Sequence, residues 1–286
     1  MRSKQQHSVN FKPLIYLCFF FLFLFLLKLG SIFSSSKMQN LQRKSFKSSY
    51  PFSTSGSETY EKLPQSLAEG IVHYATANFT PQQTFKELQI TLKVLERRSP
   101  CNFLIFGLGN DSLMWSMLNH NGRTVFLEEN QKWMEEVKKH MTSMEAYQVD
   151  FDTYTVGQAV EALHIGQEND CKEVTDPRLS KCKLAIKNFP DEVYNTEWDV
   201  IMVDGPTGFR PDLPGRMTAI YTAGLMARNR KNGETDVFVH DIDRWVENKF
   251  SMTFLCEAYW REEIGKIRHF TIPSHRGVWL QRPFCP

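Results

Sequence analysis

The chain has 286 residues, 42% of them hydrophobic and 13% aromatic, enough to bury one sizeable core but not two. Its net charge of +2 is unevenly spread, since residues 1–62 hold 9 Lys/Arg against 2 Asp/Glu and the remainder hold 25 against 30. The remainder is therefore acidic, which argues against a nucleic-acid or general polyanion binder. We expect one folded domain over residues 63–286 behind an N-terminal appendage.

The appendage has the pattern of a membrane anchor. A basic stretch, 1–12, precedes an apolar run, 13–33, of about the 20 residues that cross a bilayer, and Lys28 within it can snorkel. Because positive charge stays cytoplasmic, the chain after the span is expected in the lumen of the secretory pathway. The Ser- and Lys-rich residues 34–62 predict a flexible stem. A cleaved signal peptide is the alternative, although no Ala-x-Ala-like site is clear.

The cysteines fit an oxidising compartment. Five of the six follow the apolar run, so disulfides are expected and at least one thiol stays unpaired. Cys171 and Cys182 flank a short polar loop and are the first expected pair, with Cys256 and Cys285 as the next and Cys101 as the candidate free thiol. Zinc is the alternative, but no Cys-x-x-Cys or His-x-x-x-His spacing supports it.

Strands and helices alternate through the folded part. A helix is predicted to begin with Thr80 as its cap and Gln83 completing a capping box, and to end at Ser99-Pro100. The elements predicted after it are a strand at 102–106, a helix at 111–119, a strand at 124–127, a helix at 131–141, strands at 145–151 and 198–203, a helix at 216–229 and a strand at 236–240. Residues 153–197 form a long insertion between strands.

Two further strand-like runs, 267–272 and 277–281, are joined by a Pro-Ser-His turn and predict an antiparallel hairpin. The fold class predicted is therefore α/β, a doubly wound and mostly parallel sheet with an antiparallel C-terminal hairpin. Within the helix at 216–229, an apolar stripe is expected to be core. Its members are Met217, Ile220, Tyr221, Gly224 and Leu225.

The turn after the first strand is the candidate cofactor site. Gly107 and Gly109 allow the backbone to approach a ligand closely, and Glu128 follows Gly107 by 21 residues, where nucleotide-binding α/β domains place an acid on ribose hydroxyls. A tight strand-to-helix turn without a ligand is the structural alternative. No Gly-Lys-Ser/Thr follows, which excludes a P-loop. Phe106 and Asp111 break the dinucleotide pattern, which argues against a dehydrogenase.

Two glycosylation sequons occur, at Asn78 and Asn110. A glycan on Asn110 would block the glycine turn, so Asn78 is the predicted site.

The strongest chemical constellation is Asp204 at one strand end with His240-Asp241 at the next. Neighbouring parallel strands place their carboxyl ends side by side at the ligand crevice, so these groups are expected to meet. Such a cluster can deprotonate a sugar hydroxyl, or hold a divalent cation that acidifies it. The alternative for either acid alone is the capping of a turn or helix.

The loop at 208–216 adds Arg210 and Arg216 as candidate substrate-binding residues. Arg contacts carboxylates through two N–H groups at once, so both residues are candidates for holding a uronic acid. A solvated loop is the alternative.

Several segments in order carry a family resemblance: NFLIFGLGNDSLMW, LNHNGRTVFLEEN, WDVIMVDGPTG, PGRMTAIYTAGLMARNR, ETDVFVHDID and HFTIPSH. Over about residues 65–286 the chain resembles the plant Golgi polysaccharide methyltransferases, whose best-known members are glucuronoxylan 4-O-methyltransferases. The resemblance implies a Rossmann-like methyltransferase fold in a single-pass type II Golgi membrane enzyme with a luminal domain. It implies transfer of methyl from S-adenosylmethionine to O-4 of glucuronic acid on xylan, in cell-wall synthesis.

The resemblance matches the two glycines and Glu128 to the cofactor motif, and the two strand ends to the active centre. Related branches of the family methylate glucuronic acid on arabinogalactan, or act in xylan deposition without an established activity. The TPQQTF and HFTIPSH segments are more similar to the glucuronoxylan branch. The intact acids and glycines argue against a non-catalytic luminal protein.

Overall fold

The computed structural model describes residues 64–76, 78, 82–140, 144–276 and 282–286. The expected tail, membrane span and stem, residues 1–62, lie outside the described residues. Within the described ranges, no helix combines the length and the apolar character needed to cross a bilayer.

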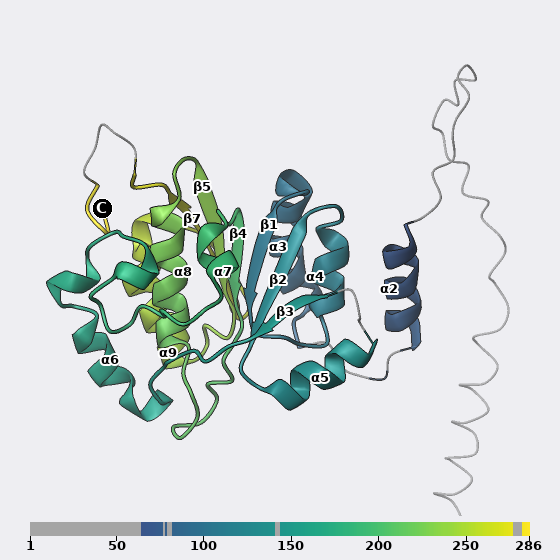
Figure 1. Cartoon of the computed structure of the whole chain (residues 1–286), viewed down its shortest axis with the longest axis horizontal. Coiled ribbons are helices and arrows are strands. Elements are labelled where there is room, and N and C mark those ends of the chain that lie inside the picture. The colour runs from purple at the N-terminus through teal and green to yellow at the C-terminus, as the bar shows by residue number, and fades with distance from the viewer. Residues whose placement is uncertain (1–63, 77, 79–81, 141–143, 277–281) are drawn as a thin grey trace, which may run out of the picture. The chain divides into compact units, whose positions relative to one another are not determined.

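A seven-stranded sheet organises the described part, in the order β3-β2-β1-β4-β5-β7-β6 (Figure 1). Neighbours from β3 to β5 pair in parallel, and β7 runs antiparallel to β5 and β6. The strands are β1 Asn102–Phe106, β2 Arg123–Glu128, β3 Glu145–Gln148, β4 Val200–Val203, β5 Glu234–Val239, β6 Trp260–Ile264 and β7 Ile267–Pro273. The fold class predicted from the sequence is confirmed, because the sheet is doubly wound and mostly parallel and has an antiparallel C-terminal pair.

The antiparallel pair that the structure describes includes a strand that was not predicted. β7 pairs with β6, which precedes it, through a turn at Gly265 and Lys266. The predicted partner, 277–281, lies outside the described residues. β6 reads WREEI and lies at the sheet edge, where charged side chains are favoured, so it lacks the apolar alternation that marks a buried strand.

Helices cover both faces of the sheet (Figure 1). The helices of the described ranges are α2 Gln65–Thr76, α3 Phe85–Arg98, α4 Ser112–Leu118, α5 Gln131–His140, α6 Ala159–Ile165, α7 Asp191–Asn195, α8 Met217–Asn229 and α9 Trp245–Phe250, of which α2 packs against α4. Alternate residues of β1 belong to opposite core layers: Phe103 and Ile105 pack with residues of α3, α4 and α5, whereas Leu104 and Phe106 pack with the insertion, α8 and α9. This alternation follows from the two-residue period of a strand.

α3 begins four residues later than predicted. Its cap is Thr84, whose side chain accepts the N–H of Glu87 while the Glu87 carboxylate accepts the N–H of Thr84 at 2.5 Å. The segment TPQQTFKE contains two consecutive capping-box patterns, 80–83 and 84–87, and the second caps the helix. Gln83, expected within the helix, instead lies before it and is buried.

The core prediction for α8 is confirmed, since all five residues of its apolar stripe are buried. This helix packs between the sheet and α9, so its burial extends around almost the whole circumference. The long insertion between β3 and β4 is also present, and it carries α6 and α7.

Two disulfides are formed in the structure. Cys171–Cys182 closes a loop of the insertion, Cys256–Cys285 ties down the C-terminal residues, and Cys101 is a buried free thiol. Beside the second disulfide, Arg228 is fully buried, stacks on Phe284 at 4.0 Å and donates to its carbonyl at 2.9 Å. Burial lowers the pKa of Arg228 to about 9.

Peptide mapping under non-reducing conditions is expected to recover Cys171 linked to Cys182 and Cys256 linked to Cys285, with Cys101 as a slow-reacting thiol. Burial raises the pKa of Cys101 to about 11, so little thiolate forms at neutral pH. Recovery of Cys171 and Cys182 as free thiols would contradict both the pairing and the oxidising compartment.

Candidate functional site

A cavity of about 580 Å³ opens at the carboxyl ends of the parallel strands. Strand order reverses between β1 and β4, and ligands of open α/β sheets bind at such a switch point. The predicted residues that line this cavity are Gly107, Gly109, Glu128, Asp204, Arg216, His240 and Asp241. The topology has therefore brought together seven of the eight candidates, which are far apart in sequence.

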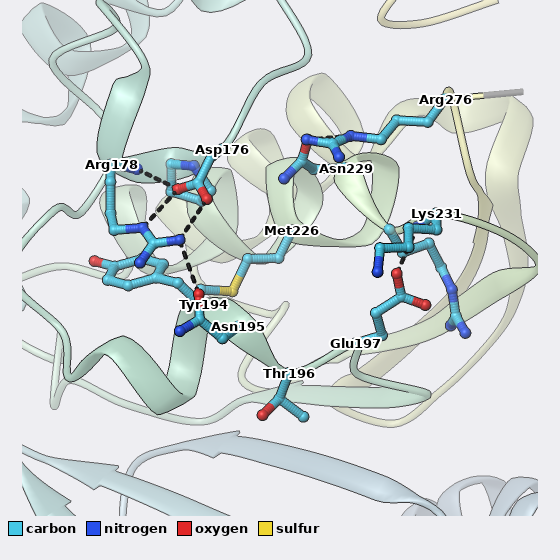
Figure 2. Close-up of a pocket in the computed structure, with 12 residues that line it drawn as sticks. Asp176, Arg178, Tyr194, Asn195, Thr196, Glu197, Met226, Asn229, Lys231 and Arg276 are labelled. Atoms are coloured by element: carbon cyan, nitrogen blue, oxygen red, sulfur yellow. Dashed lines mark hydrogen bonds and ion pairs between the residues drawn. The ribbon is translucent and has the colours of Figure 1, made fainter.

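A second, smaller pocket, of about 270 Å³, lies near the start of β4 and the end of α8 (Figure 2). Its polar groups mostly contact one another: Arg178 donates to Asp176 and Asn195, and the Glu197 carboxylate accepts the N–H of Lys231. None of the predicted site residues lines it. The first cavity is therefore the candidate active site.

The glycine turn is required by the protein's own packing. Gly107 has φ +109°, and a Cβ there would lie 3.1 Å from the backbone nitrogen of Gly205. A Cβ on Gly205 would in turn lie 2.8 Å from the Cα of Gly107. The turns after β1 and β4 thus touch backbone to backbone, which leaves room for glycine alone and sets the floor of the cavity.

Glu128 holds the glycine turn against the end of β2. Its carboxylate accepts the N–H of Leu108 at 3.1 Å and that of Asn130 at 2.8 Å. Burial raises the pKa of Glu128 and these backbone donors lower it, with a raised pKa as the net result. Each carboxylate oxygen keeps a further lone pair, so Glu128 can still accept a ligand hydroxyl.

Trp133 of α5 forms a wall of the cavity that the sequence did not identify. Its indole N–H donates to the carbonyl of Leu108 at 2.6 Å, and about a third of the side chain stays exposed. The sequence shows an aromatic residue shortly after the acidic pair that ends β2. That position alone did not distinguish a cavity-lining tryptophan from one buried in the core.

Asp204, His240 and Asp241 meet as predicted. His240 Nδ1 lies 3.0 Å from Asp204 Oδ1 and 3.6 Å from Asp241 Oδ1. Asp241 has φ +61°, in the left-handed region that is uncommon outside glycine, and the cap of α9 is Arg244. Asp241 is therefore not an ordinary helix cap.

His240 and Asp241 are both charged at neutral pH. Burial lowers the pKa of His240, but its hydrogen bonds and charge interactions with the two acids outweigh this and raise the pKa to about 10. Burial also disfavours the Asp241 carboxylate, yet His240 and two neighbouring arginines hold the pKa of Asp241 far below its usual range. Both residues are thus poor proton acceptors, which leaves Asp204, partly exposed and lining the cavity, as the available carboxylate.

Arg216 organises these acids. Its guanidinium lies 3.3 Å from Asp204 and 2.9 Å from Asp241, and it donates to the carbonyls of Pro206 and His240 at 2.9 and 3.0 Å. These contacts leave it little capacity for a substrate carboxylate. Arg210, the other arginine predicted to bind substrate, is exposed, pairs with Asp212 and does not line the cavity.

The same three groups have the chemistry of a divalent-cation site. One ligand atom from each of Asp204, His240 and Asp241 lies within 4.8 Å of the others. Two carboxylates and an imidazole suit such an ion, provided that His240 loses the proton on its ligating nitrogen.

The raised pKa of His240 predicts a pH-dependent effect of His240→Gln on stability. The folded-state pKa of about 10 exceeds the unfolded value of 6.5, so the stabilisation is complete below pH 6.5 and is lost as pH rises toward 10. The difference in free energy of unfolding between wild type and variant should therefore be largest near pH 6 and smallest near pH 10. Urea titrations measure it, with exposed His164→Gln as the control. A pH-independent difference would contradict a charged His240.

Comparison with known proteins identifies the family. The family model IRX15/IRX15L/GXM matches residues 86–270. Glucuronoxylan 4-O-methyltransferase 3 of Arabidopsis thaliana is 57% identical over 225 residues, which cover 79% of this chain and 75% of that protein. Arabinogalactan O-methyltransferase 2 of the same plant is 49% identical over 219 residues, which cover 75% of each chain.

Among solved structures, a methyltransferase-like protein from Silicibacter pomeroyi matches with 14% identity and a TM-score of 0.41, covering 68% of this chain and 89% of that one. The family match extends over both halves of the sheet and over the residues that line the cavity from Gly107 to Lys266. The chain belongs to the IRX15/IRX15L/GXM family.

Proposed function

We propose that this protein is an S-adenosylmethionine-dependent O-methyltransferase that methylates O-4 of glucuronic acid side chains on glucuronoxylan. The observation that carries the proposal is the 57% identity to a glucuronoxylan 4-O-methyltransferase across the domain that contains the cavity. Within that domain the glycine turn, Glu128 and the acid cluster converge on one cavity of about 580 Å³, within the usual size range of ligand pockets.

The cofactor side of the cavity is acidic. Glu128 and Glu129 lie together at the end of β2, and burial together with the Glu128 charge raises the pKa of Glu129. When bound, S-adenosylmethionine supplies an electrophilic methyl group on a positively charged sulfur. Adjacent carboxylates favour such a cation, and Glu128 can accept the ribose hydroxyls.

The acceptor side must orient a hydroxyl and remove its proton. Asp204 accepts the proton, while the His240 imidazolium donates through Nδ1 to Asp204 at 3.0 Å and keeps its carboxylate oriented. Arg216 contacts both Asp204 and Asp241, and its positive charge reduces the repulsion between the two carboxylates. Fixing the hydroxyl in line with the methyl group supplies much of the remaining rate enhancement.

A divalent cation is the second route to the same proton transfer. Asp204, His240 and Asp241 would hold it, and when bound it would lower the pKa of the acceptor hydroxyl.

Two alternatives concern the acceptor and turnover. Methylation of glucuronic acid on arabinogalactan is supported by the 49% identity to Arabinogalactan O-methyltransferase 2, which is lower than the identity to the xylan enzyme. A non-catalytic luminal protein of xylan deposition would not need a complete acid cluster at the switch point.

We further propose that the protein is a single-pass type II Golgi membrane protein with its domain in the lumen. The basic residues 1–12 and the apolar run 13–33 support this orientation, and a short Phe-rich span suits the thinner membranes of the early pathway. The two disulfides support an oxidising compartment. Asn78 is exposed and is the proposed glycan site. The partners proposed for the protein are the Golgi membrane and the polysaccharide substrate, and no nucleic acid.

The direct test incubates a purified 45–286 fragment with labelled S-adenosylmethionine and either de-methylated glucuronoxylan or arabinogalactan. Mass spectrometry then locates the methyl group. Label at O-4 of glucuronic acid on xylan supports the proposal, label on arabinogalactan alone selects the alternative acceptor, and label on neither contradicts both.

Replacement of Glu128 by Ala is expected to weaken cofactor binding. The variant loses charge-assisted hydrogen bonds to the ribose, each worth about 1.5–3 kcal/mol. Calorimetry with S-adenosylhomocysteine measures the dissociation constant, and exposed Glu135→Ala on α5 is the control. An unchanged constant would show that Glu128 only braces the glycine turn, with Glu129 as the next candidate.

Replacement of Asp204 or Asp241 by Asn is expected to lower turnover about 100-fold or more while cofactor affinity stays nearly intact. Asp212→Asn, on the exposed loop outside the cavity, is the matched control. Chelator treatment separates the two routes: loss of activity restored by added cation supports the metal, and no effect supports Asp204 as the base. Near-normal turnover in both Asn variants would contradict the assignment of Asp204 and Asp241 to the active site.

A further inference from the structure

Charge is unevenly distributed along the cavity. Glu128 and Glu129 come from the end of β2, whereas Arg244 comes from the loop between β5 and α9, and Lys266 from the turn between β6 and β7. In the sheet, β2 lies on one side of the β1–β4 switch point, and β5 and β7 lie on the other. Asp204 and Asp241 also line the cavity, but Arg216 and His240 offset their charges. The cavity therefore has an acidic end at β2, suited to a cationic cofactor, and an opposite end where Arg244 and Lys266 add positive charge, suited to an anion.

The backbone of Lys266 is fixed although its side chain is not. Its N–H donates to the buried Glu87 carboxylate at 2.6 Å, and its carbonyl accepts the N–H of Ile242 at 3.0 Å. Gly265 has φ +59°, and a Cβ there would collide with Glu87, so the turn is held closely against α3. The capping box of α3 thus places Lys266 at the rim of the cavity.

The Lys266 ammonium is available for exchange. Its partner, Asp243, lies at 3.0 Å, and both side chains are about half exposed. An exposed pair of this kind contributes little to stability, because water and salt screen it. A ligand carboxylate at the cavity rim can therefore replace Asp243 at small cost.

Arg244 connects the basic end to the acid cluster. One of its terminal nitrogens donates to the carbonyl of Thr207 at 2.9 Å, and the other lies 2.9 Å from Asp241. The first of these nitrogens also lies 3.7 Å from Glu247. A guanidinium has five N–H donors, so these contacts still leave donors for a ligand, and about a third of the side chain is exposed. Arg244 is therefore a rigid cation that keeps capacity for an anion.

The structure of the acceptor sugar requires a cation close to the group that removes the proton. In glucuronic acid the carboxylate and the 4-hydroxyl are on adjacent ring carbons, so the group that binds the carboxylate must lie close to the group that takes the proton. Arg244 meets this condition, because it contacts Asp241, which contacts His240 beside Asp204. Arg216 contacts Asp204 directly, but its guanidinium already pairs with Asp204 and Asp241 and donates to two backbone carbonyls.

We propose that Lys266 and Arg244 form the subsite that binds the acceptor's carboxylate and selects a uronic acid over a neutral sugar. This inference rests on the proposed function and names the part of the cavity that recognises its substrate class. Lys266 is the better probe of the subsite, since its replacement leaves the contacts of Asp241 intact.

The test compares the full-length wild type with Lys266→Met on two acceptors. One is a xylan oligosaccharide bearing glucuronic acid, and the other is the same oligosaccharide after its carboxyl group is reduced to an alcohol. Loss of a charge-assisted contact should raise KM for the acidic acceptor about tenfold, with little change in kcat. KM for the reduced acceptor should be the same in both proteins, and Lys266→Arg should restore much of the selectivity.

Two controls sharpen the comparison. Lys249→Met removes an exposed lysine of α9 that does not line the cavity and should leave both KM values unchanged. Asp243→Asn removes the competing carboxylate and should not raise KM for the acidic acceptor.

A wild-type KM for the acidic acceptor in Lys266→Met would overturn the subsite, as would an equal rise on both acceptors, which indicates a structural role. Failure of the wild type to methylate either acceptor would instead count against the proposed function. In that case calorimetry with the acidic oligosaccharide still tests the subsite. The subsite requires about tenfold weaker binding of this oligosaccharide to Lys266→Met than to the wild type, whether or not turnover occurs.

Discussion

The buried guanidinium of Arg216 is the contact on which the arrangement of the site depends. Two carboxylates, Asp204 and Asp241, share it at the ends of adjacent strands, and it also ties down the carbonyls of Pro206 and His240. Buried charges are tolerated only when they are paired, and without Arg216 the Asp204 carboxylate would keep only His240 as a cationic contact, while Asp241 would keep His240 and Arg244. The charge of Arg216 therefore allows the chain to concentrate acids where the sheet edge meets the cavity.

This pairing divides the work among the clustered residues. His240, positively charged, orients Asp204, and the low pKa of Asp241 makes it a fixed counter-charge for the arginines around it. Asp204 retains the exposure that proton transfer needs. The remaining cations, Arg244 and Lys266, lie at the opposite end from Glu128, so the two ends of one cavity suit ligands of opposite charge.

The framework that carries these charges is built from backbone contacts. Gly107 and Gly205 bring the turns after β1 and β4 together, so the cofactor end and the acid cluster share one floor. At the other end, the α3 capping box reaches across to the β6–β7 turn through Glu87. A local helix-start motif thereby fixes the backbone of a residue 179 positions further along the chain.

The sequence by itself determined the α/β fold class, the buried α8, the strand ends that carry Asp204 and His240-Asp241, and the glycine turn. These follow from local patterns: apolar runs of strand length, helical periodicity, and the rule that parallel strands end at one edge. Only the tertiary structure decided which cations serve the acids and which face the cavity. Arg210 and Arg216 look alike in sequence, but one is solvated and the other is buried among carboxylates. Lys266 carried no signal, because the edge strand before it is charged and was not predicted, so its place beside the site arises from a contact between distant segments.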